Sequence, residues 1–229
     1  MPSRKILVDA VLFDMDGTLI DSTPGLHKAW ATFSADYNLG DPLVVVHDTH
    51  GRRLADTLRE YCRISDESKL ESEIDRFEEE VINGGPIALP GVAALLSQLA
   101  HDTASGWTIV TSATRNYAPR ALERCDIPLP AVGIVTSNDV SQGKPHPAPY
   151  LTGAAKCGVD AANCLVVEDA ISGIRSGKAA GAAVLAVCTS TTRETIIQSD
   201  SQPDFIVTDL TKVTAKWING QIEVTVNDE

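Results

Sequence analysis

The stretch VLFDMDGTLIDS, residues 11–22, passes from apolar to acidic within three residues. Residues 11–13 are typical of the end of a buried strand, and Asp14 and Asp16 follow at once, two positions apart. Two carboxylates this close raise each other's pKa unless a cation or a shared proton relieves their repulsion. The stretch therefore predicts a metal site, a proton-sharing pair, or both, at the end of a strand.

Strands and helices alternate along most of the chain. Short apolar runs predict strands at 6–13, 107–112, 132–135, 164–167, 182–187 and 204–209. Helical patterns lie between them at 92–101, 116–125, 147–157 and 170–180. Apolar strands joined by crossover helices indicate a parallel sheet that is covered on both faces. The predicted fold class is α/β, with a Rossmann-like three-layer parallel-sheet core.

One long segment, 21–86, interrupts the alternation with helix-like sequence and ends in the turn residues NGGP. We interpret 21–86 as an inserted all-helical domain, with 1–20 and 87–229 forming the catalytic core. The charged residues at 66–80 are expected to form a solvated helix face.

The C-terminal stretch WINGQIEV, 217–224, has two interpretations. Asn219-Gly220 is typical of a helix stop and equally of the turn of a β-hairpin.

Polar side chains stand where the predicted strands end. They are Asp14, Asp16, Thr111, Ser112, Asn138, Asp139, Glu168 and Asp169. In an open parallel sheet, ligands bind beyond the carboxyl ends of the strands, so these side chains are expected to converge. The carboxylates of Asp14, Asp16 and Asp169 supply the hard oxygen ligands that suit Mg²⁺. Lys144, in a nearby loop, adds the positive charge needed to neutralise a phosphate monoester.

The segments DMDGT, TSATR, GKPHPAPYL and VVEDAISGI resemble, in order and spacing, the four motifs of the haloacid dehalogenase-like hydrolases. The inserted segment resembles the helical cap of that superfamily. HGRR, LPGV, TSATR and NDVSQGKPHPAPYL are most similar to its fungal branch of glycerol-3-phosphate and 2-deoxyglucose-6-phosphate phosphatases. The resemblance implies a phosphoric monoester hydrolase that acts on small polyol or sugar phosphates through a phospho-aspartate, with glycerol 3-phosphate as the first expected substrate.

The resemblance also implies a catalytic role for each motif. Asp14 would be the nucleophile, and Asp16 would be the general acid and base. Ser112 would bind the phosphoryl oxygens, and Lys144 would bridge the nucleophile and the phosphate.

A metal site follows from the same resemblance. Mg²⁺ would be held by Asp14, Asp169 and the backbone carbonyl of Asp16. Glu168 would act on the metal through water or through the ligands.

Candidate substrate-binding residues come from two loops and the lysine. They are His50, Gly51, Arg52 and Arg53 in HGRR, then Ser112, Ala113, Thr114 and Arg115, and Lys144. Side chains of HGRR would hydrogen-bond the hydroxyls of the leaving group. The alternative is that Arg52 and Arg53 pair with acids of the helix at 71–80 and only hold the cap together.

Other functions remain open. A phosphosugar mutase of the same superfamily is disfavoured by Thr18, because those enzymes commonly carry Val or Ile after the glycine of the first motif. A haloacid dehalogenase is rejected because it would lack the second aspartate, and a non-catalytic metal-binding relic is disfavoured by the four intact motifs.

Composition limits the partners and the compartment. The formal net charge of the 229 residues is −12, which argues against nucleic acid and anionic membranes as partners. The five cysteines form no C-x-x-C pair and are expected to be reduced. Residues 1–5 lack the apolar core of a signal peptide, and no apolar run approaches the length of a membrane span. We expect a cytoplasmic, monomeric enzyme.

Overall fold

The computed structural model describes residues 3–100 and 106–227, and a five-stranded parallel sheet lies at its centre. In spatial order its strands are β5 (Trp107–Ile109), β2 (Ala10–Phe13), β6 (Cys164–Glu168), β7 (Ala183–Val187) and β8 (Phe205–Val207). Most of their residues are apolar and buried, as expected for strands that are covered on both faces. The predicted α/β fold with a parallel sheet is confirmed.

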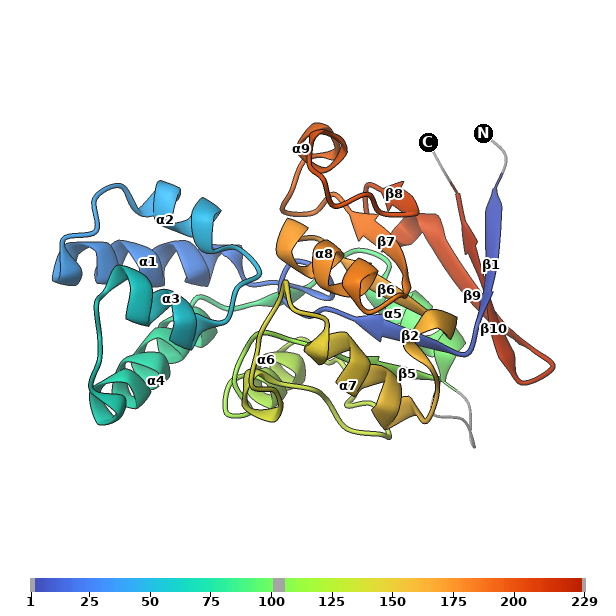
Figure 1. The fold of residues 1–229 in the computed structure, drawn as a ribbon, viewed down its shortest axis with the longest axis horizontal. Coiled ribbons are helices and arrows are strands. Elements are labelled where there is room, and N and C mark those ends of the chain that lie inside the picture. Colours follow the sequence, from blue (N-terminus) through green and yellow to red (C-terminus); the bar gives the residue numbers. More distant parts are fainter. Residues whose placement is uncertain (1–2, 101–105, 228–229) are drawn as a thin grey trace.

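Helices cover both faces of the central sheet (Figure 1). Ala10 and Leu12 of β2 pack with α7 (Ala148–Cys157) and α8 (Ile171–Ala179). Val11 and Phe13 point to the opposite face and pack with α5 (Val92–Leu99) and α6 (Ala118–Arg124). The alternation of side chains along each strand thus produces the three layers.

Short elements complete the core. They are the helix α9 (Arg193–Gln198) and the 3₁₀ turns Ser137–Asp139, Ala161–Asn163 and Leu210–Lys212. The predicted helix at 92–101 ends at Leu99 in the structure, and residue 101 lies outside the described residues.

The prediction of one strand over 6–13 is wrong. β1 (Arg4–Val8) ends before Asp9 and pairs antiparallel with β10, whereas β2 begins after Asp9 in the parallel sheet. Asp9 is polar within the apolar run, and its Oδ1 accepts a hydrogen bond from Gln221 Nε2 at 2.8 Å. The chain therefore changes sheets at this residue.

The C-terminal Asn-Gly is the turn of a hairpin. β9 (Val213–Ile218) and β10 (Gln221–Val226) pair antiparallel around Asn219 and Gly220, whose φ angles are 50° and 84°. Positive φ at both central residues is typical of the two-residue hairpin turn that Asn-Gly favours. Together with β1, the hairpin forms a second, three-stranded sheet beside the first.

The strand predicted at 132–135 is also wrong. Only Val135 pairs, in an isolated parallel bridge with Val110. Gly133 has a φ of 76° within a turn that follows Pro130, so the extended conformation is limited to the end of the segment.

Helices α1 to α4 lie beyond the carboxyl end of β2 (Figure 1). They are α1 (Thr23–Tyr37), α2 (Pro42–Thr49), α3 (Leu54–Tyr61) and α4 (Glu67–Asn83). We refer to these helices and their connecting loops as the cap. Two short antiparallel strands, β3 (Ile20–Asp21) and β4 (Ile87–Ala88), join them to the core.

An aromatic cluster packs α1 against α4. The ring centroids of Trp30 and Phe77 are 4.9 Å apart, and those of Phe33 and Phe77 are 5.1 Å apart. Both pairs have the edge-to-face arrangement that aromatic rings favour.

In the described ranges, none of the helices combines the length and hydropathy needed to cross a bilayer.

Candidate active site

Loops at the carboxyl ends of the strands converge on one buried cluster of charges. The Nζ atom of Lys144 lies 2.6 Å from Asp14 Oδ1 and 2.6 Å from Glu168 Oε1. Asp14 follows β2, Glu168 ends β6, and Lys144 comes from the loop that precedes α7. All three side chains are buried, so the lysine offsets two carboxylates that water barely reaches.

Burial dominates the electrostatics of this cluster. It raises the pKa of Asp14 well above its usual range; the charge of Glu168 adds to the rise and Lys144 opposes it. Burial by itself would lower the pKa of Lys144, but Asp14 and Glu168 outweigh that effect and raise it. Lys144 is therefore charged, and Asp14 depends on nearby cations to be ionised.

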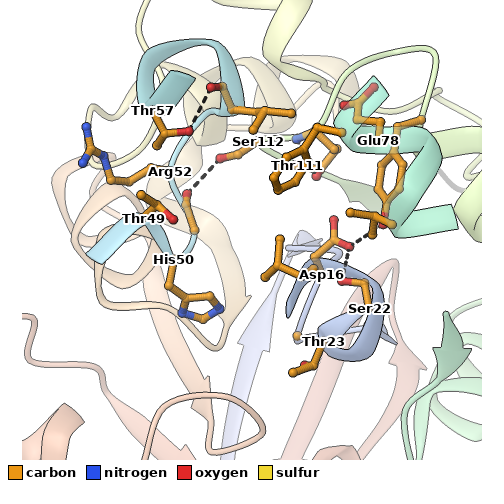
Figure 2. A pocket seen from close by; sticks show the side chains of 18 of the residues that line it. Asp16, Ser22, Thr23, Thr49, His50, Arg52, Thr57, Glu78, Thr111 and Ser112 are labelled. Carbon is orange, nitrogen blue, oxygen red and sulfur yellow. Dashed lines mark hydrogen bonds between the residues drawn. The ribbon is translucent and has the colours of Figure 1, made fainter. Parts of the chain in front are cut away.

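Asp16 is held by two hydroxyl groups. Its Oδ1 accepts a hydrogen bond from Ser22 Oγ at 2.6 Å (Figure 2). It also accepts one from the hydroxyl of Tyr117 at 2.9 Å. Burial raises the pKa of Asp16, whereas these two hydrogen bonds lower it. A carboxyl with a raised pKa and a fixed orientation has the properties of a general acid and base.

Buried carboxylates also form a group that fits a metal ion. Asp14, Glu168 and Asp169 each offer an oxygen, and these atoms lie within 4.8 Å of one another. Hard oxygen donors of this kind fit Mg²⁺ better than a softer ion. The side chain of Asp16 lies outside this group, so its predicted contribution to the metal is limited to the backbone carbonyl.

Glu168 has its oxygens occupied by the protein. Its Oε1 accepts hydrogen bonds from Lys144 Nζ at 2.6 Å and from the Tyr150 hydroxyl at 2.7 Å. Its Oε2 accepts from the backbone N–H groups of Asp169 and Ala170, both at 3.1 Å. Because a carboxylate offers about four acceptor positions, this favours Glu168 as a partner of the lysine over a role as a direct ligand.

Close packing around Gly17 holds Asp169 in place. A Cβ atom on Gly17 would lie 2.0 Å from Asp169 Oδ2, and the φ angle of Gly17 is +88°. Ser190 donates a hydrogen bond to Asp169 Oδ2, and Thr18 Oγ1 lies 3.4 Å from Asp169 Oδ1. Glycine is therefore required at position 17 both for the backbone conformation and for the space that the carboxylate occupies.

The loop after β5 contacts the cap. Ser112 Oγ donates a hydrogen bond to the carbonyl of Gly51 at 3.0 Å, and the Ala113 N–H donates to Thr111 Oγ1. Thr114 donates two hydrogen bonds to Glu78 of α4, from its N–H at 3.1 Å and from its hydroxyl at 2.5 Å.

Arg115 lies further out than the rest of this loop. Its side chain is 62% exposed and pairs with Asp139 at 3.3 Å. The predicted substrate-binding loop is thus divided between residues that contact the cap and one that faces solvent.

The HGRR segment approaches the core from the cap side. His50 Nε2 lies 3.2 Å from Asp169 Oδ2. Burial by itself would lower the pKa of His50, but the charges of Asp169, Glu168 and Asp14 raise it to about 9. The cap therefore brings a positive charge to the acidic cluster.

The two arginines of this segment pair with acids of α3. Arg52 Nη2 lies 2.5 Å from Glu60 Oε2, and Arg53 Nε lies 2.9 Å from Asp56 Oδ2. Arg53 also donates a hydrogen bond to the carbonyl of Val140 in the core. The alternative that these arginines pair with acids at 71–80 is wrong in its partners, because the acids belong to α3, the helix that directly follows the arginines.

A cavity of about 130 Å³ lies between the cap and the core. Figure 2 shows Thr49, His50 and Arg52 on one side of it and Asp16 and Ser22 on the other. Further lining residues are Asp14, Ser112, Tyr117 and Glu78, together with the apolar Leu26, Trp30, Phe77 and Val81 of α1 and α4. Arg53, Thr114, Arg115 and Lys144 do not line this cavity in the described part of the chain.

The sequence also matches a known protein family. Residues 8–181 match the haloacid dehalogenase-like hydrolase family. This chain is a haloacid dehalogenase-like hydrolase. The predicted family is confirmed.

The hydrolase has curated relatives in bacteria and yeast. It is 39% identical to hexitol phosphatase A of Escherichia coli over 178 residues, which cover 77% of this chain and 81% of the relative. It is 35% identical to glycerol-1-phosphate phosphohydrolase 1 of Saccharomyces cerevisiae, covering 81% of this chain and 77% of the relative. The predicted similarity to a fungal glycerol-phosphate hydrolase is thus confirmed.

Among solved structures, a hydrolase from Pseudomonas syringae superimposes on this hydrolase with a TM-score of 0.75 at 25% sequence identity. The match covers 88% of this chain and 93% of that chain. The likeness therefore extends over the core and the cap together.

Several residues around the cavity, above all Tyr117 and Glu78, were not predicted from the sequence. Glu78 belongs to the run at 66–80 that was expected to face solvent, but it is only 6% exposed. A signal was available, because Ile74, Phe77, Glu78 and Val81 follow the helical spacing of one apolar face. No local pattern marks Tyr117, which reaches Asp16 from 101 positions away.

Proposed function

We propose that this hydrolase is a Mg²⁺-dependent phosphatase that hydrolyses small polyol or sugar phosphate monoesters through a phospho-aspartate. Glycerol 3-phosphate is the first candidate substrate, followed by 2-deoxyglucose 6-phosphate and other polyol or hexose phosphates. The observation that carries the proposal is the Lys144 Nζ atom 2.6 Å from Asp14 Oδ1, beside a cavity that Asp14 shares with Asp16. The names of the bacterial and yeast relatives support the same substrate class.

In the first step, a carboxylate oxygen of Asp14 forms a bond to phosphorus as the bond from phosphorus to the leaving oxygen breaks. Asp16 gives its proton to that oxygen, so the product leaves as a neutral alcohol. The raised pKa of Asp16 supports its entry in the protonated form. Lys144 stabilises negative charge on the phosphoryl group, and Ser112 donates a hydrogen bond to it once released from Gly51.

In the second step, Asp16 removes a proton from a water molecule that attacks phosphorus. The bond between phosphorus and the Asp14 oxygen breaks, and inorganic phosphate is released. Ser22 and Tyr117 keep the same oxygen of Asp16 oriented in both steps. Asp16 thus acts first as an acid and then as a base, and it regains in the second step the proton that it gave away in the first.

Mg²⁺ would be held by Asp14, Asp169 and the backbone carbonyl of Asp16. When bound, it supplies positive charge that lowers the pKa of Asp14 and offsets the charge of the phosphate. Glu168 supports the site by holding Lys144.

We further propose that residues 21–86 act as a closing cap and that 1–20 and 87–229 form the catalytic core. Closure would exclude water from the phosphoryl group, as is common for lids over active sites. The hydrogen bond from Ser112 to Gly51 supports a closed arrangement in this structure. A cytoplasmic enzyme is supported by five free cysteines, and a monomer is the expected state in size-exclusion chromatography.

The alternative is a phosphosugar mutase of the same superfamily. Thr18 favours a phosphatase, and its hydroxyl lies 3.4 Å from Asp169 Oδ1, a contact that Val or Ile would lose. A non-catalytic relic is disfavoured by the buried pair of Asp14 and Lys144. Burying two charges costs desolvation free energy, and buried charges of this kind are concentrated at functional sites.

The deciding experiment is phosphate release from a panel of metabolite phosphates, compared by kcat/KM, with and without EDTA. Hydrolysis of polyol or sugar phosphates that EDTA abolishes supports the proposal. Conversion of a hexose 1-phosphate to its isomer without phosphate release would identify a mutase. If no ester is turned over, the result would favour the non-catalytic metal-binding protein.

A further inference from the structure

A buried carboxylate from the cap faces the same cavity as Asp16. Glu78 lies on α4, is 6% exposed, and lines the cavity beside Phe77 and Val81. Figure 2 shows Glu78 across from His50 and Arg52 and near Thr111. None of the proposed catalytic steps uses this side chain.

The hydrogen-bond partners of Glu78 leave its charge unbalanced. Both donors come from Thr114, whose N–H and hydroxyl lie 3.1 Å and 2.5 Å from the two carboxylate oxygens. Thr114 is neutral, and the arginine that lines the cavity, Arg52, is paired with Glu60. Since a carboxylate has about four acceptor positions, two on Glu78 remain for a ligand.

Burial is the main reason that the pKa of Glu78 rises to about 7, with Asp16 and Asp75 adding to the rise and Thr114 opposing it. A substantial fraction of Glu78 is therefore ionised near neutral pH, within a cavity that also contains Asp16. The α4 side of this cavity therefore favours hydroxyl donors and repels a second anion. The positive charge of His50 lies on the opposite side and is paired with Asp169 at 3.2 Å.

We propose that Glu78 is a specificity-determining residue that selects phosphate esters with neutral, hydroxyl-bearing leaving groups over esters whose leaving group carries a carboxylate. The inference rests on the proposed phosphatase function. A leaving-group hydroxyl can donate a hydrogen bond to Glu78, whereas a carboxylate in its place brings two like charges together in a site that excludes water.

Two substrates form a matched pair for the test. Glycerol 3-phosphate and 3-phosphoglycerate of the same configuration at C2 differ only in a terminal CH₂OH or carboxylate group. The measurement is kcat/KM for both esters at about pH 8.5, where a carboxyl with a pKa of about 7 is almost fully ionised, with the wild-type chain and with Glu78→Gln. Glutamine keeps an acceptor for the Thr114 N–H and removes the charge, so we expect the preference for glycerol 3-phosphate to fall by about tenfold or more.

Glu79→Gln is the control. Glu79 is the next residue of α4, its side chain is 52% exposed, and it pairs with Arg120 at the surface. This variant removes the same charge outside the cavity, so the preference is expected to stay unchanged. Glu78→Asp keeps the charge and is expected to retain most of the preference.

The outcomes separate the two proposals. Hydrolysis of glycerol 3-phosphate by the wild type, with the same preference in Glu78→Gln, would overturn the role of Glu78 and leave the phosphatase function intact. Equal shifts in the Glu78 and Glu79 variants would also overturn it. If the wild type hydrolyses no ester, both proposals fail. If Glu78→Gln does not fold, Glu78→Ser removes the same charge and takes its place.

Discussion

The hydroxyl of Tyr117 donates a hydrogen bond to Asp16 Oδ1 at 2.9 Å. This contact joins the N-cap residue of α6 to the loop after β2. Tyr117 is 3% exposed, so this contact is shielded from water. It orients a carboxyl that the proposed mechanism uses in both steps.

Tyr117→Phe is therefore expected to reduce kcat for an alkyl phosphate by about tenfold, the effect of losing one hydrogen bond to a charged group. The loss should be smaller for p-nitrophenyl phosphate, whose leaving group needs no proton. Steady-state kinetics with both substrates tests this, with Tyr61→Phe in α3 as the control. Equal losses on both substrates would indicate a purely structural role for Tyr117.

Asp14→Asn should abolish turnover, because an amide cannot form the acyl phosphate. The fold should be retained, since the change is nearly isosteric and removes a buried charge, and the pKa of Asp14 is raised first by burial and then by the charge of Glu168. Phosphate release and thermal unfolding measure the two effects. Substantial activity in protein that mass spectrometry shows to be free of deamidation would favour direct attack by water.

Asp169→Ala should weaken Mg²⁺ binding and activity together by at least about tenfold, with partial recovery at high Mg²⁺. Isothermal titration with Mg²⁺ alone provides a readout that is independent of turnover. Asp200→Ala is the control, because Asp200 is 77% exposed and pairs with Arg175 at the surface. Unchanged Mg²⁺ affinity in Asp169→Ala would refute the proposed metal site.

Gly51→Ala should impair closure of the cap. A Cβ atom at Gly51 would lie 2.6 Å from both Ala170 Cβ and Ser172 Oγ of the core, and its φ is +71°. Gly40 in the cap has a φ of +87° and no atom within 4 Å of such a Cβ, so Gly40→Ala reproduces the backbone strain without the clash. We expect kcat/KM to fall by about tenfold or more in Gly51→Ala only, measured at equal folded fraction. Equal falls in both variants would assign the effect to strain.

Stability should depend on pH through Glu78. Its pKa rises from an ordinary value of 4.5 to about 7 on folding, so the folded state binds the proton more tightly between these values. The wild type should therefore lose stability relative to Glu78→Gln as pH rises through this window, by up to about 3 kcal/mol above it. Urea unfolding of both proteins at about pH 5 and about pH 8 measures the difference. A constant difference between the two pH values would contradict the assignment.

The convergence of the acidic side chains at one edge of the sheet could be predicted from the ends of the strands. Asp14, Lys144 and Asp169 are far apart in sequence, but parallel strands bring their carboxyl ends to one edge, so the meeting follows from topology. The antiparallel sheet of β1, β9 and β10 was not predicted, because one polar residue, Asp9, diverts a continuous apolar run into a second sheet.

Side-chain partners in the cap were harder to predict than the core. Arg53 had several acids within reach, and the nearest along the helix, Asp56, became its partner. Glu78 was predicted to face solvent because most residues of 66–80 are charged, although its spacing placed it on the apolar face of α4. Pairings of this kind depend on how helices rotate and pack, which the pattern of the sequence specifies only in part.

The antiparallel pair of β3 and β4 places the entry to and exit from the cap side by side, with Ile20 opposite Ala88 and Asp21 opposite Ile87. Because both crossings occur at one point, the intervening helices can be exchanged as a cassette without altering the order of the strands in the central sheet. Grafting the helices of a relative between Asp21 and Ile87 would thus leave Asp14 and Lys144 of the core in place while supplying a different wall to the cavity.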